Sequence, residues 1–336
     1  MKKPNQIFFL IIFLLLANAG YTQDIQFGQV YNNPLYLNPA MAGISPFSRL
    51  MAYNRTQWYN LDSKYISYLA GGDHFVSRYN SGLGGYLLYD QQGSLVLKSY
   101  EVQLQYAYEL VLSKTWAVRA GIQPGYVSRE LDYSTLIFPD QLNSNGAVTS
   151  TQASVPETRQ RVNYFDFSSG LMVYNTNWWG GIALHHLNRP NQSFVRNNSR
   201  LQMKISAISG YKIRLKNTEE KEISITPTMY YKAQGKSDQI DVGLYGIYNT
   251  FIASIWYRGI PGLKRYNQGL QNNESVIAMI GYKFPKLQVC YSFDYTVSKL
   301  APAGTGGVHE ISLIYYFKKN QRKKPMKTLP CPELTD

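Results

Sequence analysis

The sequence has little cysteine, histidine or charge, and these shortages exclude several classes of protein. Its 336 residues include two cysteines and four histidines, too few for a disulfide framework or for the common zinc motifs. Charged residues make up 16% of the chain, against roughly 25% in an average soluble domain. The mean hydropathy of −0.29 is too polar for a bundle of membrane helices. We therefore expect no metal and no cofactor, and neither a disordered chain nor a helical membrane protein.

Long apolar runs are also missing, apart from one near the N-terminus. Ile7 to Leu16 is apolar throughout, follows two lysines and precedes small residues, which is typical of a secretory signal peptide. Ten residues are too few to cross a bilayer as a helix. We expect residues 1–22 to be a signal peptide, with cleavage after Ala19 or at Thr22, and the remaining chain to be exported.

Tyrosine, glycine and small polar residues are abundant, and they alternate with apolar residues at a period of two. In residues 287–297 every second position is Leu, Val, Tyr or Phe, and the positions between are polar or small. Residues 100–109 and 204–215 repeat the pattern. Period two indicates β-strands with one apolar and one polar face. At ten residues or more, these strands are long enough to cross a bilayer when tilted.

The whole body of the chain can be divided into such strands, which predicts an all-β, antiparallel outer-membrane β-barrel of about 14 strands. The long connections all follow odd-numbered strands, and the connections after even-numbered strands are short, as in barrels with short periplasmic turns and longer outer loops. Both termini are then expected in the periplasm. The predicted strands are 48–58, 64–75, 82–90, 97–110, 115–128, 163–174, 178–187, 203–215, 222–233, 238–248, 251–258, 275–284, 287–297 and 308–317.

Residues 23–47 precede the first strand and do not alternate. Two prolines five residues apart exclude a central strand here. One interpretation is an ordered leader that only starts the barrel at residue 48. The other, which we favour, is a segment that enters the lumen and narrows it, because fourteen strands enclose a space that side chains fill poorly. The candidate lumen residues are Asn33, Pro34, Leu35, Tyr36, Asn38, Pro39 and Gly43.

A basic tail, residues 318–336, follows the last strand of the 48–317 barrel. We expect it to be periplasmic and to dock on a partner, with a solvated or lipid-bound tail as the alternative. The candidate docking residues are Lys318, Lys319, Arg322, Lys323, Lys324 and Lys327. The excess of basic residues elsewhere is mild, and it does not indicate a nucleic-acid partner.

Catalytic and metal sites find no support in the sequence. His185 and His186 are adjacent in a predicted strand, so we expect them on opposite faces, one in the lumen and one at the membrane. No GxSxG motif is present, and the chain is expected not to be an enzyme. Cys290 and Cys331 are expected to be two free thiols, although a bridge between the tail and the barrel stays open.

Four segments together resemble a known family. They are QDIQFGQVYNNPLYLNPAMAG (23–43), YNRTQW (53–58), FDFSSGLMVY with WWGGIALHHLNRP (165–190) and GVHEISLIYYF (307–317). They resemble the PorP/SprF family of outer-membrane proteins of the type IX secretion system of Bacteroidetes. The resemblance covers essentially the whole mature chain.

The resemblance implies a non-enzymatic accessory role in protein secretion. It implies, as partners, a secreted surface adhesin or gliding motility cargo with a type B C-terminal domain, and periplasmic and outer-membrane components of the type IX machinery. We expect outer-membrane lipid to surround the barrel wall. The alternative function is an outer-membrane channel or small-molecule transport barrel, which would need an open lumen.

Overall fold

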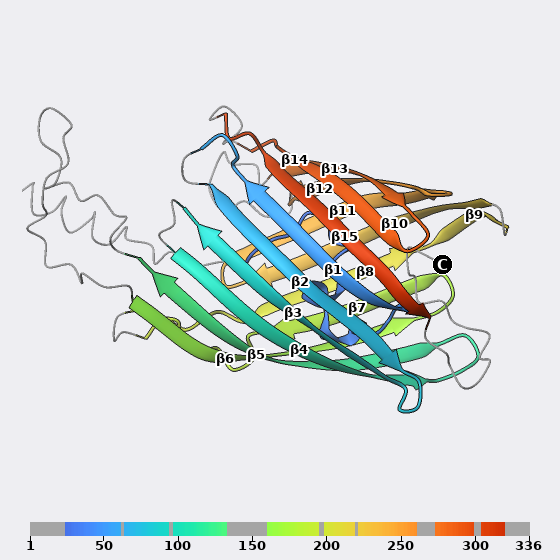
Figure 1. Cartoon of the computed structure of the whole chain (residues 1–336), viewed down its shortest axis with the longest axis horizontal. Helices are drawn as coiled ribbons and strands as arrows, with labels where there is room; N and C mark the ends of the chain where they lie inside the picture. The colour runs from blue at the N-terminus through green and yellow to red at the C-terminus, as the bar shows by residue number, and fades with distance from the viewer. Residues whose placement is uncertain are drawn as a thin grey trace, which may run out of the picture.

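A single antiparallel sheet closes on itself into a barrel in the computed structural model, which describes residues 24–61, 64–93, 97–132, 160–194, 198–218, 221–260, 273–298 and 304–319 (Figure 1). The strands are β1 (Phe47–Gln57), β2 (Tyr65–Val76), β3 (Ser81–Gln92), β4 (Leu97–Val111), β5 (Ala117–Leu131), β6 (Gln160–Tyr174), β7 (Trp178–His185), β8 (Lys204–Tyr211), β9 (Ile213–Thr218), β10 (Lys221–Gln234), β11 (Ser237–Tyr248), β12 (Phe251–Gly259), β13 (Asn273–Lys283), β14 (Leu287–Thr296) and β15 (Val308–Lys319).

The barrel wall has fourteen strands, because β8 and β9 are two segments of one strand. Both pair with β10, and only Lys212 separates them. The wall closes where β15 pairs with β1, from Phe47 opposite Lys319 to Gln57 opposite Val308. The predicted fold class is therefore confirmed. Each predicted strand end lies within three residues of an observed one.

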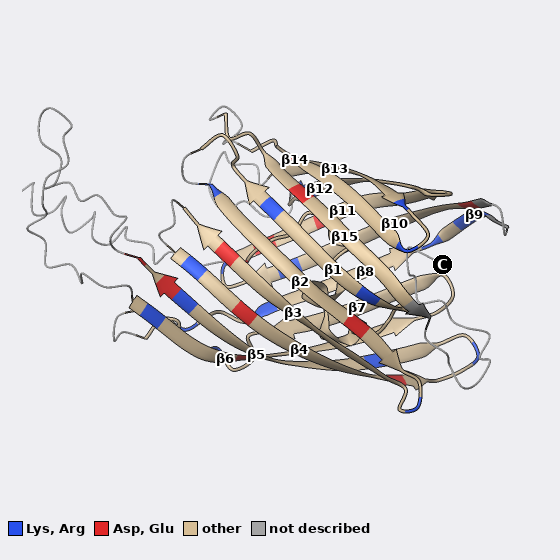
Figure 2. Cartoon of the chain, in the orientation of Figure 1, with Lys and Arg blue, Asp and Glu red and all other residues tan. Residues whose placement is uncertain are grey.

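Alternation along the strands separates an apolar exterior from a polar interior. On β4, Leu104 is 62% exposed while its neighbour Gln103 is 2% exposed. The last strand follows the same rule, with Ile311, Leu313, Tyr315 and Phe317 exposed on the outside. Charged residues are few along the strands and spaced apart (Figure 2). An outer surface of this kind is suited to lipid, since apolar side chains there need no water.

The two ends of the barrel differ in the length of their connections. At one end, here called the turn end, strands are joined by short segments such as 77–80, 175–177 and 249–250. At the other, the loop end, the connections include 132–159, 186–203 and 260–272. The loop end lies on the left of Figure 1 and the end of β15 on the right. No helix among the described residues is long and apolar enough to cross a membrane.

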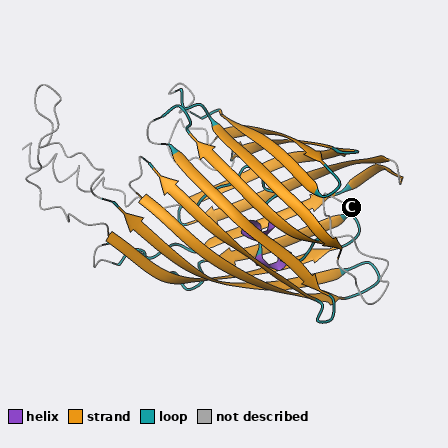
Figure 3. Ribbon diagram, in the orientation of Figure 1, coloured by secondary structure: helices purple, strands orange, loops and turns teal. Residues whose placement is uncertain are grey.

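The hydrophobic core lies inside the barrel and depends on the N-terminal segment. Residues 24–46, here called the strap, include the helical turn α2 (Pro34–Leu37) and the 3-10 turn η1 (Pro39–Met41), which lie within the barrel (Figure 3). Leu37, Ala40 and Met41 pack against inward side chains such as Trp179 and Trp256. The strap therefore provides one side of the core, and the strands provide the other.

Candidate functional site

The strap runs through the lumen from the loop end to the turn end. Asp24 contacts Lys204 at the start of β8 and Gln234 at the end of β10, both at the loop end. Twenty-three residues later, Phe47 begins β1 at the turn end. The first described residue and the end of β15 thus lie at opposite ends of the barrel. For Asp24, this differs from the expectation that both termini lie on the same side.

Asn38, Pro39 and Gly43 lie in the half of the strap nearer the turn end. The Asn38 side chain donates to the backbone carbonyls of Leu171 and Ile182, at 3.3 and 3.2 Å, and accepts from Ala40 N at 2.9 Å. Pro39 begins the 3-10 turn, where its missing N–H leaves no bond unmade. Gly43 has a positive φ of 64°, and its N–H donates to Asp73. These contacts tie the strap to three separate parts of the wall.

Asn33, Pro34, Leu35 and Tyr36 lie farther from the turn end. Pro34 begins α2, and Leu35 is fully buried. The Leu35 carbonyl accepts from Gln105 Nε2 at 2.6 Å. The Tyr36 hydroxyl donates to the carbonyl of Ile25 within the strap, at 2.7 Å. All seven candidate lumen residues therefore lie inside the barrel. The side-chain amide of Asn33 makes no hydrogen bond with any described residue.

Arg119 fixes the strap at the turn end. Its side chain is fully buried on β5 and donates to the carbonyls of Ala40 and Ala42. Glu109 on β4 balances its charge at 2.7 Å and also accepts from the Tyr174 hydroxyl. A backbone–guanidinium contact of this kind needs the strap in place, because the guanidinium would otherwise be buried with unmet donors.

Glu310 fixes the strap nearer the loop end. Its carboxylate accepts from the backbone N–H groups of Gly28 and Gln29, at 2.7 and 3.0 Å, and pairs with Arg55 at 2.8 Å. On β12, three strands from β15, Arg258 donates to the Phe27 carbonyl while it pairs with two carboxylates. The strap backbone is therefore clamped by one acidic and one basic group.

A charged cluster holds the first described residue of the strap. Asp24 lies 2.6 Å from Lys204 Nζ and 2.8 Å from His186 Nε2, and His186 Nδ1 lies 3.0 Å from Asp166 without hydrogen-bond alignment. Burial lowers the pKa of His186, but Asp24 and Asp166 outweigh it and raise that pKa to about 10. Burial raises the pKa of Asp24, yet His186 and Lys204 leave it well below its ordinary value. Asp24 and His186 are therefore both charged at neutral pH.

The prediction that His185 and His186 face opposite sides of the wall is wrong. His185 ends β7 as a buried lumen residue beside the Leu37 carbonyl. His186 has a positive φ of 59°, which ends the strand. Its side chain therefore also points into the lumen, where it contacts Asp24. Alternation applies only while the backbone is extended. No glycine at position 186 marked this change in the sequence.

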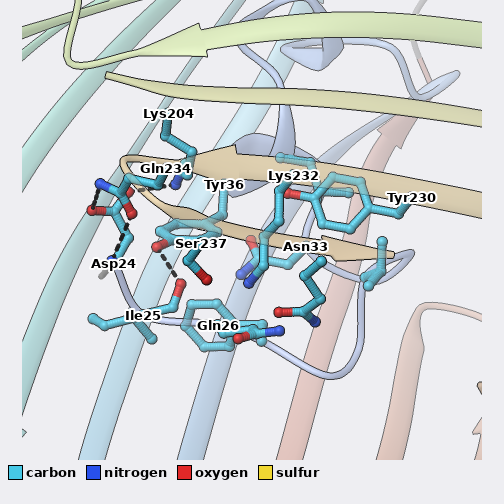
Figure 4. Close-up of a pocket in the computed structure, with 14 residues that line it drawn as sticks. Asp24, Ile25, Gln26, Asn33, Tyr36, Lys204, Tyr230, Lys232, Gln234 and Ser237 are labelled. Carbon is cyan, nitrogen blue, oxygen red and sulfur yellow. Dashed lines mark hydrogen bonds and ion pairs between the residues drawn. The ribbon is translucent and has the colours of Figure 1, made fainter. Parts of the chain in front are cut away.

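Two of the small cavities beside the strap lie near the loop end. One, of about 40 Å³, lies between the strap and β8, β10 and β11 (Figure 4). The other, of about 70 Å³, lies on the opposite side of the strap and is lined by polar residues such as Glu101, Arg129 and His186. Since one water needs about 10–15 Å³ by this measure, each of the two has room for a few small groups.

The basic tail falls mostly outside the described residues. Lys318 and Lys319 belong to β15 and pair with Ser48 and Phe47 of β1, so the last strand is two residues longer than predicted. Arg322, Lys323, Lys324 and Lys327 lie outside the described residues, as does Cys331. Cys290 is a buried free thiol on β14. Among the described residues, no group of His, Cys, Asp or Glu could hold a metal ion.

The molecule is an integral outer-membrane β-barrel whose lumen is occupied by its own N-terminal strap. A family model described as type IX secretion system membrane protein PorP/SprF matches residues 19–315. The chain belongs to this family.

Comparisons with solved structures found similar folds at low sequence identity. A comparison with curated proteins found no match. Among solved structures, the CymD monoaromatic hydrocarbon channel is 13% identical, with a TM-score of 0.44. The match covers 89% of this chain and 96% of the CymD chain. A Pseudomonas aeruginosa FadL homologue is 11% identical, with a TM-score of 0.42 and coverage of 86% and 96%. The Pseudomonas putida toluene transporter TodX is 9% identical, with a TM-score of 0.41 and coverage of 90% and 96%.

Proposed function

We propose that this protein is a non-enzymatic accessory of the type IX secretion system that supports the export or surface attachment of a particular cargo. The cargo is a surface adhesin or gliding-type protein with a type B C-terminal domain. The observation that carries the proposal is the family match over residues 19–315, which spans the strap and nearly the whole barrel. Secretion machinery is therefore the expected partner.

The occupied lumen supports a binding role over the alternative of an open channel. The strap is fixed at the turn end by Arg119 and nearer the loop end by Glu310. A transport barrel would have to release both attachments to conduct. A cargo or machinery contact at either mouth of the barrel needs no such release.

The proposed orientation places the loop end at the cell surface and the turn end in the periplasm, as in other barrels with unequal connections. The basic tail after Lys319 then faces the periplasm, where we propose that it docks on the machinery. Asp24 lies near the outer mouth in this orientation. Cargo would meet the loop end, where the strap begins.

The test is a comparison of surface proteins between the parent strain and a strain that lacks this protein. We expect one adhesin, or a small set, to disappear from the surface while other type IX cargo is displayed normally. Complementation with the parental gene should restore it. Identical surface proteomes would contradict the proposal, and so would a loss of all type IX cargo, which would indicate a general machinery role.

A truncation after Thr328 tests the tail separately. It keeps the six basic residues Lys318, Lys319, Arg322, Lys323, Lys324 and Lys327 and removes only residues 329–336. A protein dock should weaken, whereas a purely electrostatic contact with lipid should not. Parental assembly with the machinery after truncation would contradict docking by the terminal segment.

A further inference from the structure

The pocket between the strap and β10 contains buried polar groups that lack partners among the described residues (Figure 4). Asn33 is 1% exposed, and neither the nitrogen nor the oxygen of its amide makes a hydrogen bond. The side-chain nitrogen of Gln26 is also buried without an acceptor. Buried polar groups in folded proteins nearly always have a partner. An occupant with acceptor atoms would supply it.

The side chain of Asn33 does not cap the helical turn that follows it. It stands at the N-cap position of α2, where an Asn side chain commonly accepts from the helix backbone, yet it makes no capping bond. Its neighbour Asn32, by contrast, bonds to Gln29 and Gln288. The two adjacent amides therefore differ: one completes the strap's contacts with the wall, and the other lines an open pocket.

The same pocket is lined by a lysine that has no acidic partner among the described residues. Lys232 lines it from β10, and in the described part of the chain no acidic side chain forms an ion pair with it. The nearby carboxylates have other partners: Asp24 pairs with Lys204, and Asp241 pairs with Arg258. An ammonium group that is partly withdrawn from water favours a negatively charged neighbour.

We propose that this pocket binds a carboxylate group. The side-chain nitrogens of Gln26, Asn33 and Lys232 are all donors, and a carboxylate offers two acceptor oxygens and the opposite charge. The volume of about 40 Å³ has room for about three water-sized groups, the number of heavy atoms in a carboxylate. A neutral amide would leave the charge of Lys232 unmet, and a phosphate group is larger.

The pocket is reached from the loop end of the barrel. Its lining includes Asp24, Gln234 and Ser237, which lie at the start of the strap and beside the β10–β11 turn. The carboxylate could belong to a small free anion or to a polypeptide, as an acidic side chain or a chain terminus. Both sources share the chemistry that the pocket recognises.

The test uses the full-length protein in lipid nanodiscs and 13C-labelled formate, with binding followed by NMR line broadening. We expect saturable broadening that unlabelled formate reverses and that formamide, which has the same number of heavy atoms and no charge, does not. Lys232→Met should weaken binding by about tenfold or more, since a charge-assisted hydrogen bond is lost. The matched control is Lys236→Met, which removes the same charge from the nearby turn outside the pocket.

A second variant guards against misfolding of the first. Asn33→Asp keeps the shape of the side chain and should also abolish formate binding, because it places a negative charge in the pocket. Heat-modifiable migration on gels checks that each variant is folded. Equal binding by folded Lys232→Met or Asn33→Asp, or equal competition by formamide, would overturn the proposal, as would the absence of saturable binding in the parental protein.

Competition with acetate and with N-acetylglycine distinguishes the two sources of the carboxylate. Both are carboxylates, and the second also carries a peptide group. Stronger competition by N-acetylglycine supports a polypeptide as the natural occupant, and stronger competition by acetate supports a free anion. If neither acetate nor N-acetylglycine displaces formate, the proposal of a carboxylate site is overturned.

Discussion

Arg119 makes the most direct contacts with the half of the strap nearer the turn end. Replacing it with Met would leave Glu109 buried without its cation and the carbonyls of Ala40 and Ala42 without a donor. We expect Arg119→Met to lower the free energy of unfolding by about 3–5 kcal/mol, as for other broken buried pairs. Urea unfolding of the refolded barrel in detergent measures this.

The double variant Arg119→Met with Glu109→Gln provides the control for that experiment. It removes both charges, and Gln can still accept from the Tyr174 hydroxyl. We expect it to recover part of the loss, so that the two substitutions are not additive. Simple additivity would show that Arg119 acts only through the strap carbonyls and that its pairing with Glu109 contributes nothing.

His186 makes the attachment of the strap's first residues dependent on pH. Its pKa of about 10 is above the ordinary value of 6.5, so its contribution is complete below about pH 6.5 and is lost as the pH rises through 10. The lowered pKa of Asp24 acts in the opposite direction, and its contribution is lost as the pH falls below its ordinary value of 3.8. Attachment should be strongest between these limits.

A spin label at Ile25 can report this change. In a background of Cys290→Ser and Cys331→Ser, with Ile25→Cys labelled, the label should become more mobile between pH 6 and pH 10. The same measurement with His186→Gln should show little change over that range. If the parental and His186→Gln proteins respond equally, the pH dependence arises from other groups, such as Lys204.

At the scale of elements, we expect the strap to limit passage through the barrel. The wall is closed by backbone pairing between β15 and β1, which does not involve the strap. Deleting residues 32–43 should therefore permit insertion while raising single-channel conductance in planar bilayers. Removal of residues 329–336 is the control and should leave conductance unchanged. A folded deletion variant with parental conductance would mean that the strap does not limit the pore.

The strands could be predicted from the sequence because a strand in a barrel wall is governed by its own alternation. Lipid outside and polar groups inside impose the same rule on every strand, so residues 221–234 and 287–296 were found within one residue at each end. The break at Lys212 was not predicted. Its backbone N–H bonds to the Asn177 carbonyl instead of to β10, a contact that depends on a distant turn.

The strap contacts were beyond sequence reasoning for a similar physical reason. Composition and the two prolines indicated a non-strand segment before β1, and the size of the barrel favoured a place inside it. Asn38, however, bonds to carbonyls 133 and 144 residues away. Which amides would find partners, as Asn38 does, and which would not, as with Asn33, depends on the assembled wall.

At the scale of the whole molecule, the membrane-facing surface is apolar and several charges inside the lumen are balanced in pairs. Arg49 with Asp73, Arg55 with Glu310 and Arg119 with Glu109 are all buried pairs on inward faces. These pairs sum to zero and contribute nothing to the formal net charge of +13, whereas the basic tail adds to it. This distribution fits a barrel with one membrane-spanning band and two chemically different ends.

The orientation of those ends can be tested by cysteine labelling of intact cells. We expect a membrane-impermeant maleimide to label Asn60→Cys, in the connection after β1 at the loop end, and not Thr176→Cys, in the β6–β7 turn at the other end. Both variants are made with Cys290→Ser and Cys331→Ser, so that no native thiol reacts. Labelling of Thr176→Cys after the outer membrane is permeabilised shows that the site itself is reactive. Labelling of Thr176→Cys but not of Asn60→Cys in intact cells would reverse the proposed orientation, and with it the surface position of Asp24 and the periplasmic position of the tail.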